Sequence, residues 1–354
     1  MSKAHKTPKR PRIVDVARLA DVSPQTVSNV INRRGGFTEP TRLKVEAAVA
    51  ELGFQPNRYA QSLRWQRTGL IGFDMVRRQL DVSNPFTVGL LHALVPAARR
   101  HDLRVLVVTH DENSEDEFRA TASSGLVDGF VLSDSTTGDP RAAVLQELGV
   151  PFVVMGRPGT PIPVPAVELD NAAGIRQAVD HVVAQGCRDI AYVGYSGPEH
   201  WNVERRRGIR EGLAAHGIPL PRHRVLTSPS LTTIRRRLPD FLAAEGGPDA
   251  VVANSDSIAV SIVGIAGGLG IRVGQDLAVT GFDDSPLATL VSPELTSVAI
   301  PVDPIAERLV VLLKDAIDGA QSPGSVTVPT HLVVRASSGF TPPHTSRKAA
   351  SAGR

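Results

Sequence analysis

Apolar residues near the start of the chain recur at spacings of three and four, which is the period of an α-helix. One set lies within residues 13–20 and a second within residues 27–31, with a short polar stretch between them. In that stretch Ser23 suits the N-cap of a second helix and Pro24 its first position. The pattern therefore predicts two short helices joined by a tight turn. Their inward-facing residues are Ile13, Val16, Ala17, Ala20, Val27, Val30 and Ile31.

The second of these helices has a face of amides and hydroxyls with little charge. Asparagine and glutamine can form paired hydrogen bonds with adenine in the DNA major groove, and hydroxyls can bond to phosphate oxygens. The face therefore suits the reading of base edges, although a small helical hairpin with a solvated polar face would show the same pattern. Its members are Gln25, Thr26, Ser28, Asn29 and Asn32.

A third helix is predicted to start around Thr38 and to end at Gly53, a residue that tolerates the left-handed dihedrals of a helix C-cap. Its expected core positions are Leu43, Val45, Val49 and Leu52. The segment that follows, residues 56–64, is too short to be a stable isolated helix. We expect it to fold on docking to DNA and to its copy in a second subunit.

From residue 69 the pattern changes to short apolar runs that alternate with helical stretches, which is typical of parallel sheets covered on both faces. The runs are too many for one sheet, so we predict two, the second beginning near residues 167–170. The run at 295–300 is expected to return to the first sheet, and the run at 326–337 to cross again. The other runs are residues 70–76, 104–110, 129–133, 151–156, 189–195, 250–254 and 277–282. Helices are expected over residues 86–101, 172–185, 205–216, 257–269 and 303–318.

Charge is distributed unevenly along the 354 residues. Residues 1–68 contain 13 basic and 5 acidic residues, a net charge of +8, whereas the remainder contains 26 basic and 31 acidic residues, a net charge of −5. A basic small domain next to a mildly acidic large one indicates a localised polyanionic partner. The single cysteine, Cys187, excludes an internal disulfide and is expected to be a small buried side chain. We find neither a membrane-spanning run nor a secretory signal, so we expect a cytoplasmic protein with no membrane partner.

Three linked motifs near the start closely resemble the headpiece of the LacI/GalR family of bacterial repressors. They are DVARLADVSPQTVSNVIN at residues 15–32, TRLKVEAAVAELGFQPN at 41–57 and AQSLR at 60–64. The resemblance implies a helix-turn-helix whose second helix reads a double-stranded DNA operator. It also implies that two hinge helices enter the minor groove side by side, where a leucine opens a central base step.

The resemblance assigns the DNA contacts to particular positions. The expected base contacts are Pro24, Gln25 and Asn29, and the expected phosphate contacts are Thr26, Ser28, Asn32, Thr41 and Arg42. The expected minor-groove residues of the hinge helix (56–64) are Asn57, Ala60 and Leu63, with Leu63 as the wedge unless it only packs on the next domain. Asn29 stands where several family members carry a base-reading arginine, so the operator sequence does not carry over.

The α/β pattern of the larger part resembles the two-lobed, sugar-binding core of the same family, which periplasmic binding proteins share. The fold class is therefore α/β, with an all-α headpiece before two parallel, doubly wound sheets. The expected parts are a disordered basic tail (1–11), the helix-turn-helix domain with its hinge (12–66), an effector-binding and dimerisation core (67–340) and a disordered tail (341–354). In the core we expect lobe 1 at residues 69–168 and 298–325, and lobe 2 at residues 169–297 and 326–340.

Candidate ligand contacts lie just after strands, because ligands of open parallel sheets bind beyond the carboxyl ends of the strands. Asp283 follows the run at 277–282, and the resemblance implies an effector contact for it; the alternative is capping of the short helix that follows, a role we assign to Asp284. Arg205 matches the first arginine of the family's ERLRGY motif, which points into the cleft. Ser255 matches a polar effector contact of some members.

Three further positions bear on the effector. Trp201 is expected either to stack on a sugar ring or to pack on its own lobe. Gly156 stands where many family members carry aspartate, and Ile300 where some place a polar effector contact. Both replacements make the cleft less polar, which argues against carrying over a plain sugar effector.

Together these features predict a DNA-binding transcription regulator, specifically a repressor, that binds a palindromic operator and responds to a small carbohydrate-like effector. The absence of a heptad tail favours a homodimer over a tetramer, while inducer and corepressor behaviour both stay open. An enzyme, such as a doubly wound oxidoreductase, would need a phosphate-binding glycine loop that the chain lacks, so we expect no catalytic residue and no cofactor. The ten histidines show no metal-ligand spacing, so we also expect no metal. A periplasmic solute receptor would share the core but would need an export signal and would not use residues 12–66.

Overall fold

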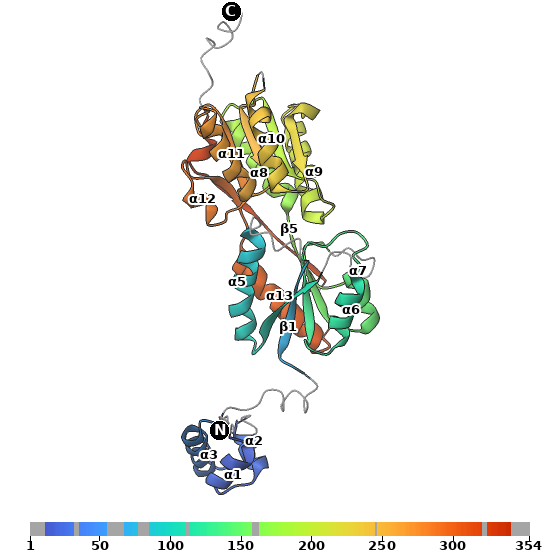
Figure 1. Ribbon diagram of the computed structural model, residues 1–354, viewed down its shortest axis with the longest axis vertical. Coiled ribbons are helices and arrows are strands. Elements are labelled where there is room, and N and C mark those ends of the chain that lie inside the picture. Colours follow the sequence, from blue (N-terminus) through green and yellow to red (C-terminus); the bar gives the residue numbers. More distant parts are fainter. Residues whose placement is uncertain are drawn as a thin grey trace, which may run out of the picture. The chain divides into compact units, whose positions relative to one another are not determined.

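Three short helices form the described part of the first of two units, residues 1–68 and residues 69–354 (Figure 1). The computed structural model describes residues 11–31, 35–54, 67–76, 85–110, 114–157, 163–244, 246–320 and 324–340. The helices of the first unit are α1 (Ile13–Leu19), α2 (Pro24–Ile31) and α3 (Glu39–Leu52). Their shared core consists of Val16, Ala17, Ala20, Val27, Val30, Val45, Ala48 and Phe54.

The start and the end of these helices follow the sequence prediction closely. Ser23 caps α2, since its hydroxyl oxygen accepts from the backbone N–H of Thr26 at 3.1 Å. Gly53 ends α3 in the left-handed conformation, with φ at 59°. One expected core residue is wrong, because Leu43 is 54% exposed. It lies two residues before the fully buried Val45, and two residues on a helix are turned about 200° apart.

The second unit begins with a six-stranded parallel sheet in the order β11-β5-β4-β3-β1-β2. Its strands are β1 (Leu70–Val76), β2 (Arg104–His110), β3 (Gly129–Leu132), β4 (Phe152–Met155), β5 (Ala166–Leu169) and β11 (Ser325–Val328). Helices α5 (Pro85–Arg100) and α13 (Val302–Ile317) cover one face, and α6 (Glu115–Ser123) and α7 (Pro140–Leu148) cover the other. We call this sheet with its helices lobe 1.

A second six-stranded sheet has the order β12-β10-β9-β8-β6-β7, in which only β12 runs antiparallel. Its strands are β6 (Ile190–Tyr195), β7 (Val225–Ser228), β8 (Ala250–Ala253), β9 (Ala278–Asp283), β10 (Thr296–Ala299) and β12 (His331–Val333). Helices α8 (Asn171–Ala184) and α9 (His200–Ala215) cover one face, and α10 (Leu231–Ala243) and α11 (Asp256–Gly268) the other. The short helices α12 (Leu287–Leu290), η2 (Arg222–Arg224) and η3 (Ala336–Ser338) complete this part, which we call lobe 2.

Two of the strand assignments made from the sequence are wrong. The strand at residues 166–169, β5, pairs with β4 in lobe 1, so it does not begin the second sheet. The strand at 296–299 stays in the second sheet beside β9. The segment between β9 and β10 is long enough for a crossover within one sheet, whereas an apolar run by itself does not specify its neighbour. The chain returns to lobe 1 with α13, as expected for residues 303–318. The strand β11 also lies in lobe 1, so the expected boundary at residue 326 is wrong, and the chain crosses to lobe 2 only at β12.

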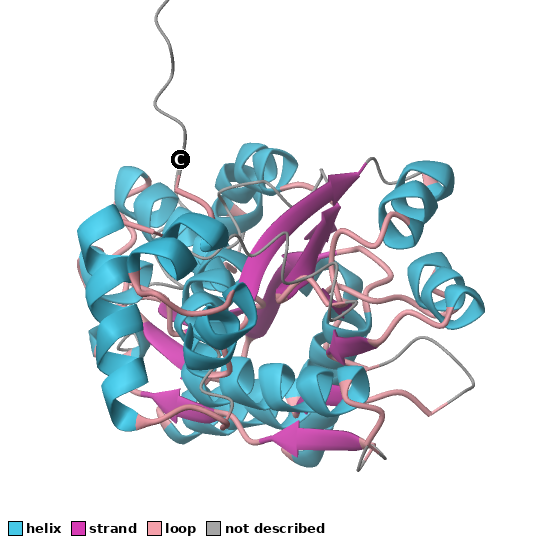
Figure 2. Cartoon of the chain, turned by 90° about the horizontal axis from the view of Figure 1, so that it is seen from below, coloured by secondary structure: helices cyan, strands magenta, loops and turns pink. Residues whose placement is uncertain are grey.

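This topology places loops and helix starts together at one edge of each sheet. In the core unit the strands lie inside a layer of helices (Figure 2). Parallel strands align their carboxyl ends, and the N-termini of the following helices lie at the same edge. Among the described residues, no helix is both long enough and apolar enough to pass through a bilayer.

Candidate functional site

Helix α2 presents a polar ridge because its other side is fixed in the core. Val27 and Val30 are buried, which leaves Gln25 exposed and Asn29 half-buried on the opposite side. The side-chain amide of Gln25 donates to the side-chain oxygen of Asn29 at 3.0 Å, so the two amides form one pair on successive turns. Such a pair offers both donors and acceptors, as an adenine edge requires.

The remaining expected DNA contacts in the described residues surround this ridge. Pro24 is exposed at the start of α2, and Thr26 and Ser28 are half-buried. Thr41 shares a hydrogen bond of 3.0 Å with Thr38 at the start of α3. Arg42 is paired with Glu39 at 2.5 Å and with Glu46 at 2.6 Å, so a phosphate would have to compete with two carboxylates for it. The other expected contacts, Asn32, Asn57, Ala60 and Leu63, lie outside the described residues.

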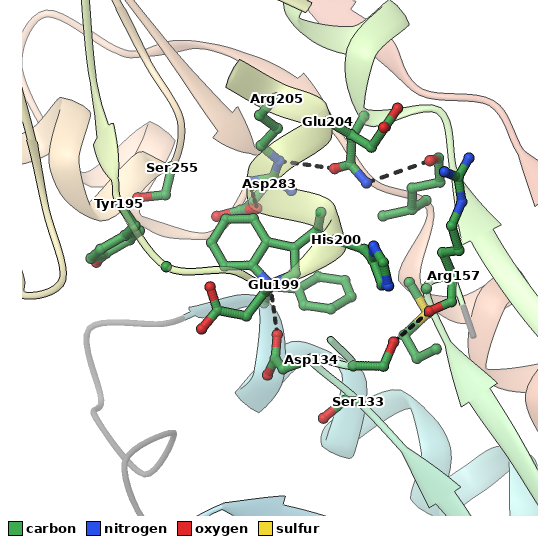
Figure 3. Close-up of a pocket in the computed structure, with 18 of the residues that line it drawn as sticks. Ser133, Asp134, Arg157, Tyr195, Glu199, His200, Glu204, Arg205, Ser255 and Asp283 are labelled. Atoms are coloured by element: carbon green, nitrogen blue, oxygen red, sulfur yellow. Dashed lines mark hydrogen bonds and ion pairs between the residues drawn. The ribbon is translucent and has the colours of Figure 1, made fainter. Parts of the chain in front are cut away.

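In the second unit a cavity of about 430 Å³ lies between the carboxyl ends of the two sheets (Figure 3). Lobe 1 contributes the residues that follow β3, β4 and β5, and lobe 2 contributes those that follow β6, β7, β8 and β9. The volume lies within the range of about 300–1,000 Å³ that is usual for small-molecule sites. Three predicted effector contacts, Arg205, Asp283 and Ser255, line it.

Arg205 is the most deeply buried cation of this cavity, at 5% exposure. Its Nε donates to the side-chain oxygen of Asn171 at 2.9 Å, and its Nη1 donates to the carbonyl oxygen of Asn254 at 2.6 Å. The guanidinium lies 3.5 Å from the ring centre of Phe282 and 4.9 Å from that of Trp201. Burial lowers the pKa of Arg205, and the nearby carboxylates oppose this shift. The result is a planar donor group held rigidly at the cavity wall.

Asp283 provides the countercharge, with its Oδ1 3.5 Å from Nη1 of Arg205. Burial raises the pKa of Asp283, whereas Arg205 and the backbone N–H of Asp256 favour its charged form. Its backbone has φ at 115°, a region that side chains rarely adopt and that costs of order 1–3 kcal/mol. A buried carboxylate that faces a cavity from a strained backbone is a strong candidate for a ligand contact.

The structure corrects one role and adds a second to another. Asp284 does not cap α12, because the N-cap residue of that helix is Pro286 and has no side-chain cap bond. The carboxylate of Asp284 pairs instead with Arg335 at 2.7 Å. Ser255 lines the cavity and also caps α11, because its hydroxyl accepts from Ile258 N–H at 3.4 Å.

Trp201 links the two lobes across the cavity. Its Nε1 donates to the Oδ1 of Asp134, which follows β3 in lobe 1, at 2.8 Å. The backbone N–H of His200 also crosses to the carbonyl oxygen of Ser135 at 3.2 Å. Trp201 therefore contacts both lobes, not its own alone, and its ring stands edge-on to Tyr195.

Sequence reasoning missed Asn171, Asp134 and Glu199 as cavity residues. Asn171 and Asp134 both follow strands, so the rule that selected Asp283 could have found them had it been applied to every strand. Gly156 also lines the cavity, while Ile300 belongs to the apolar core. Within the described ranges, no group of three or more His, Cys, Asp or Glu side chains could hold a metal ion.

Two protein families match the chain, each over one part of it. The family described as "Bacterial regulatory proteins, lacI family" matches residues 12–57, and the family described as "Periplasmic binding protein-like domain" matches residues 179–338. The HTH-type transcriptional regulator CelR of Thermobifida fusca is 34% identical over 340 residues, which cover 93% of this chain and 98% of CelR. The ribose operon repressor of Halalkalibacterium halodurans is 30% identical and covers 91% of this chain and 96% of its own length.

Solved structures show the same likeness. A CelR–cellobiose complex aligns with a TM-score of 0.70 at 31% identity, over 93% of this chain and 100% of that one. The lac repressor dimer bound to operator and the anti-inducer ONPF aligns with a TM-score of 0.80 at 25% identity, over 93% and 99% of the two chains.

Proposed function

We propose that this chain, which belongs to the LacI family of bacterial regulatory proteins, is a homodimeric repressor whose operator binding is controlled by a carbohydrate-like effector. As a member of that family it is a DNA-binding transcription regulator and not an enzyme. The observation that carries the DNA half is the Gln25–Asn29 ridge on α2, opposite the buried Val27 and Val30. One such helix per subunit would enter each half-site of a pseudo-palindromic operator.

The effector half of the proposal is supported by the cavity between the lobes. The Arg205–Asp283 pair offers donors and acceptors that suit neighbouring sugar hydroxyls, and aromatic rings of Trp201 and Tyr195 lie beside it. The similar CelR was solved as a complex with cellobiose, which supports a saccharide here. A ligand that binds one arrangement of the lobes more tightly than the other shifts the population between them, and so alters the headpiece's affinity for DNA. Both inducer and corepressor behaviour fit this scheme.

An exposed apolar surface of lobe 1 supports the homodimer. Val88 and Val95 lie two turns apart on one side of α5 and are 59% and 51% exposed. Val107, 41% exposed, lies on β2, the strand at the end of the sheet order, and α5 packs against β2. Apolar side chains gathered next to an edge strand are typical of surfaces that a partner covers.

Selection from a library of palindromic DNA, with the full-length chain, tests the DNA half. We expect one enriched sequence, and we expect Gln25→Ala to lower discrimination between it and single-base variants by about 1–3 kcal/mol per lost base contact. Affinity should also fall steeply with salt, as for any protein that neutralises several phosphates.

Lys9→Ala is the control for this selection, since a single lysine in the basic tail should weaken all DNA sequences about equally. Enrichment of no sequence, with and without candidate saccharides, would contradict the proposed function.

A further inference from the structure

The charges around the cavity are mostly negative. Of the described side chains that line it, five are carboxylates, whereas only Arg157 and Arg205 are guanidinium groups. Arg157 is exposed and lies 3.6 Å from the carboxylate of Glu168. Figure 3 labels Asp134, Glu199, Glu204 and Asp283 among the side chains that line the cavity. The five carboxylates are Asp134, Glu168, Glu199, Glu204 and Asp283.

Each lobe 2 helix that begins at the cavity has a backbone N–H bound by one of the protein's own groups. Four helices of lobe 2 begin there, and free N–H groups at such starts would normally attract anions. Three of the starts are capped by side-chain oxygens: Asp170 accepts from Ala173 N–H at 2.8 Å, Ser230 from Thr233 N–H at 3.2 Å and Ser255 from Ile258 N–H at 3.4 Å.

The fourth helix, α9, has the acidic Glu199 at its N-cap. The backbone N–H of His200 at its first position donates to Ser135, so it too has a partner. A carboxylate at this place repels an approaching anion as well as complementing the helix dipole.

The one deeply buried cation also has its counterion in place. The carboxylate of Asp283 lies between the guanidinium of Arg205 and the backbone N–H of Asp256 at the start of α11. It occupies the position that the phosphate or carboxylate of a ligand would need in order to use both groups. A charged ligand there would have to displace Asp283 or face it at close range, and the repulsion between like charges at close range strongly disfavours binding.

We propose that this cavity selects an uncharged saccharide and rejects sugar phosphates and sugar acids, because Asp283 already occupies its buried cation and the protein's own oxygen atoms cap the helix starts of lobe 2 that would otherwise bind an anion. The inference rests on the proposed function and narrows its ligand class. Neutral hydroxyls can accept a hydrogen bond from Arg205 and donate one to Asp283 at the same time. An anionic ligand could bind Arg205 only by displacing the carboxylate of Asp283.

Calorimetry on the full-length protein at about pH 9, above the raised pKa of Asp283, tests this selectivity with two matched pairs of probes. The pairs are cellobiose with cellobionic acid, and glucose with glucose 6-phosphate. In each pair that gives measurable binding, we expect the neutral member to bind at least about tenfold more tightly.

Asp283→Asn and Asp284→Asn make a matched pair of variants. The first removes the countercharge of Arg205 and should narrow the ratio between cellobiose and cellobionic acid by about tenfold or more. The second removes a neighbouring carboxylate that pairs with Arg335 and does not line the cavity, so the ratio should stay as in the unmodified protein.

The outcomes separate this inference from the proposed function. The selectivity is overturned if a charged probe binds as tightly as its neutral partner, or if Asp283→Asn leaves the ratio of the affinities for cellobiose and cellobionic acid unchanged. Neither result would contradict control by a saccharide. If neither neutral saccharide binds while operator binding persists, then the saccharide half of the proposed function fails and the selectivity fails with it.

Discussion

Asp283 illustrates at the scale of one residue how burial and pairing oppose each other. The loss of water around its carboxylate raises its pKa, while Arg205 and the N–H of Asp256 favour the ion. Asp256, directly behind it, has its pKa raised by burial to about 6 although it accepts hydrogen bonds from Ser285 and Ser297. Burial therefore raises the pKa of both carboxyl groups above the ordinary value for aspartate, against the guanidinium and the hydrogen bonds that favour their charged forms.

These raised values predict how stability depends on pH. A carboxyl group with a higher pKa in the folded state takes up a proton on folding, so its contribution is fully present at low pH and is lost as the pH rises through the folded-state value. We expect the unfolding temperature of the ligand-free protein to fall between about pH 4 and about pH 8, that is, between the ordinary aspartate pKa and the raised value of Asp283. Asp283→Asn should flatten that decline; a slope equal to that of the unmodified protein, measured by calorimetry, would contradict this assignment.

At the scale of elements, the cavity depends on the close approach of α8 and α9. A Cβ atom on Gly208 of α9 would lie 2.6 Å from the carbonyl oxygen and 2.9 Å from the Cα of Ala172, so only glycine fits at this crossing. The hydrogen bond between Asn171 and Arg205 spans the same two helices. The glycine thereby brings together two residues of the cavity wall.

Gly208→Ala should therefore separate the two helices. Overpacking of this kind destabilises by roughly 1–3 kcal/mol, and the loss of the Asn171–Arg205 contact should also weaken saccharide binding. Urea denaturation and calorimetry measure the two effects. Gly264→Ala on α11 is the matched control: its Cβ would meet no atom within 4 Å, so it should stabilise the helix by up to about 1 kcal/mol. Similar stability of the two variants would show that the helix crossing is not tight.

At the scale of the whole molecule, operator affinity should depend on the surface formed by α5 and β2. Two headpieces joined in one dimer bind two half-sites together, which raises affinity by about 10²–10⁴ over a single headpiece. Because Val95 is 51% exposed on that surface, a charge there should separate the subunits without unfolding lobe 1.

Val95→Glu should consequently sediment as a monomer and lose about 100-fold or more in operator affinity. Val203→Glu is the control, since it places the same charge at a valine of α9 that is 42% exposed. A dimer that persists in Val95→Glu, seen by analytical ultracentrifugation, would place the interface elsewhere.

Much of the molecule could be read from the sequence because the relevant information is local. Helical spacing predicts α1, α2 and α3, the chemistry of Ser23, Pro24 and Gly53 sets their ends, and continuous apolar runs predict the strands of both sheets. The motifs of the first sixty residues were sufficient to indicate the family. Of the predicted effector contacts, Arg205, Asp283 and Ser255 all line one cavity, because the topology of parallel sheets places such residues at one edge.

Only the tertiary structure decided which distant segments meet. The sheet membership of β5 and β10 depends on pairing between strands, which an apolar run does not encode. Asp284 pairs with Arg335, about fifty residues further on, so its local position after a strand suggested the wrong partner. Trp201 reaches Asp134 in the other lobe, and Asp283 neutralises Arg205 across two elements. Local periodicity and turn chemistry determined the elements, whereas contacts between residues far apart in the chain determined the charge balance of the cavity.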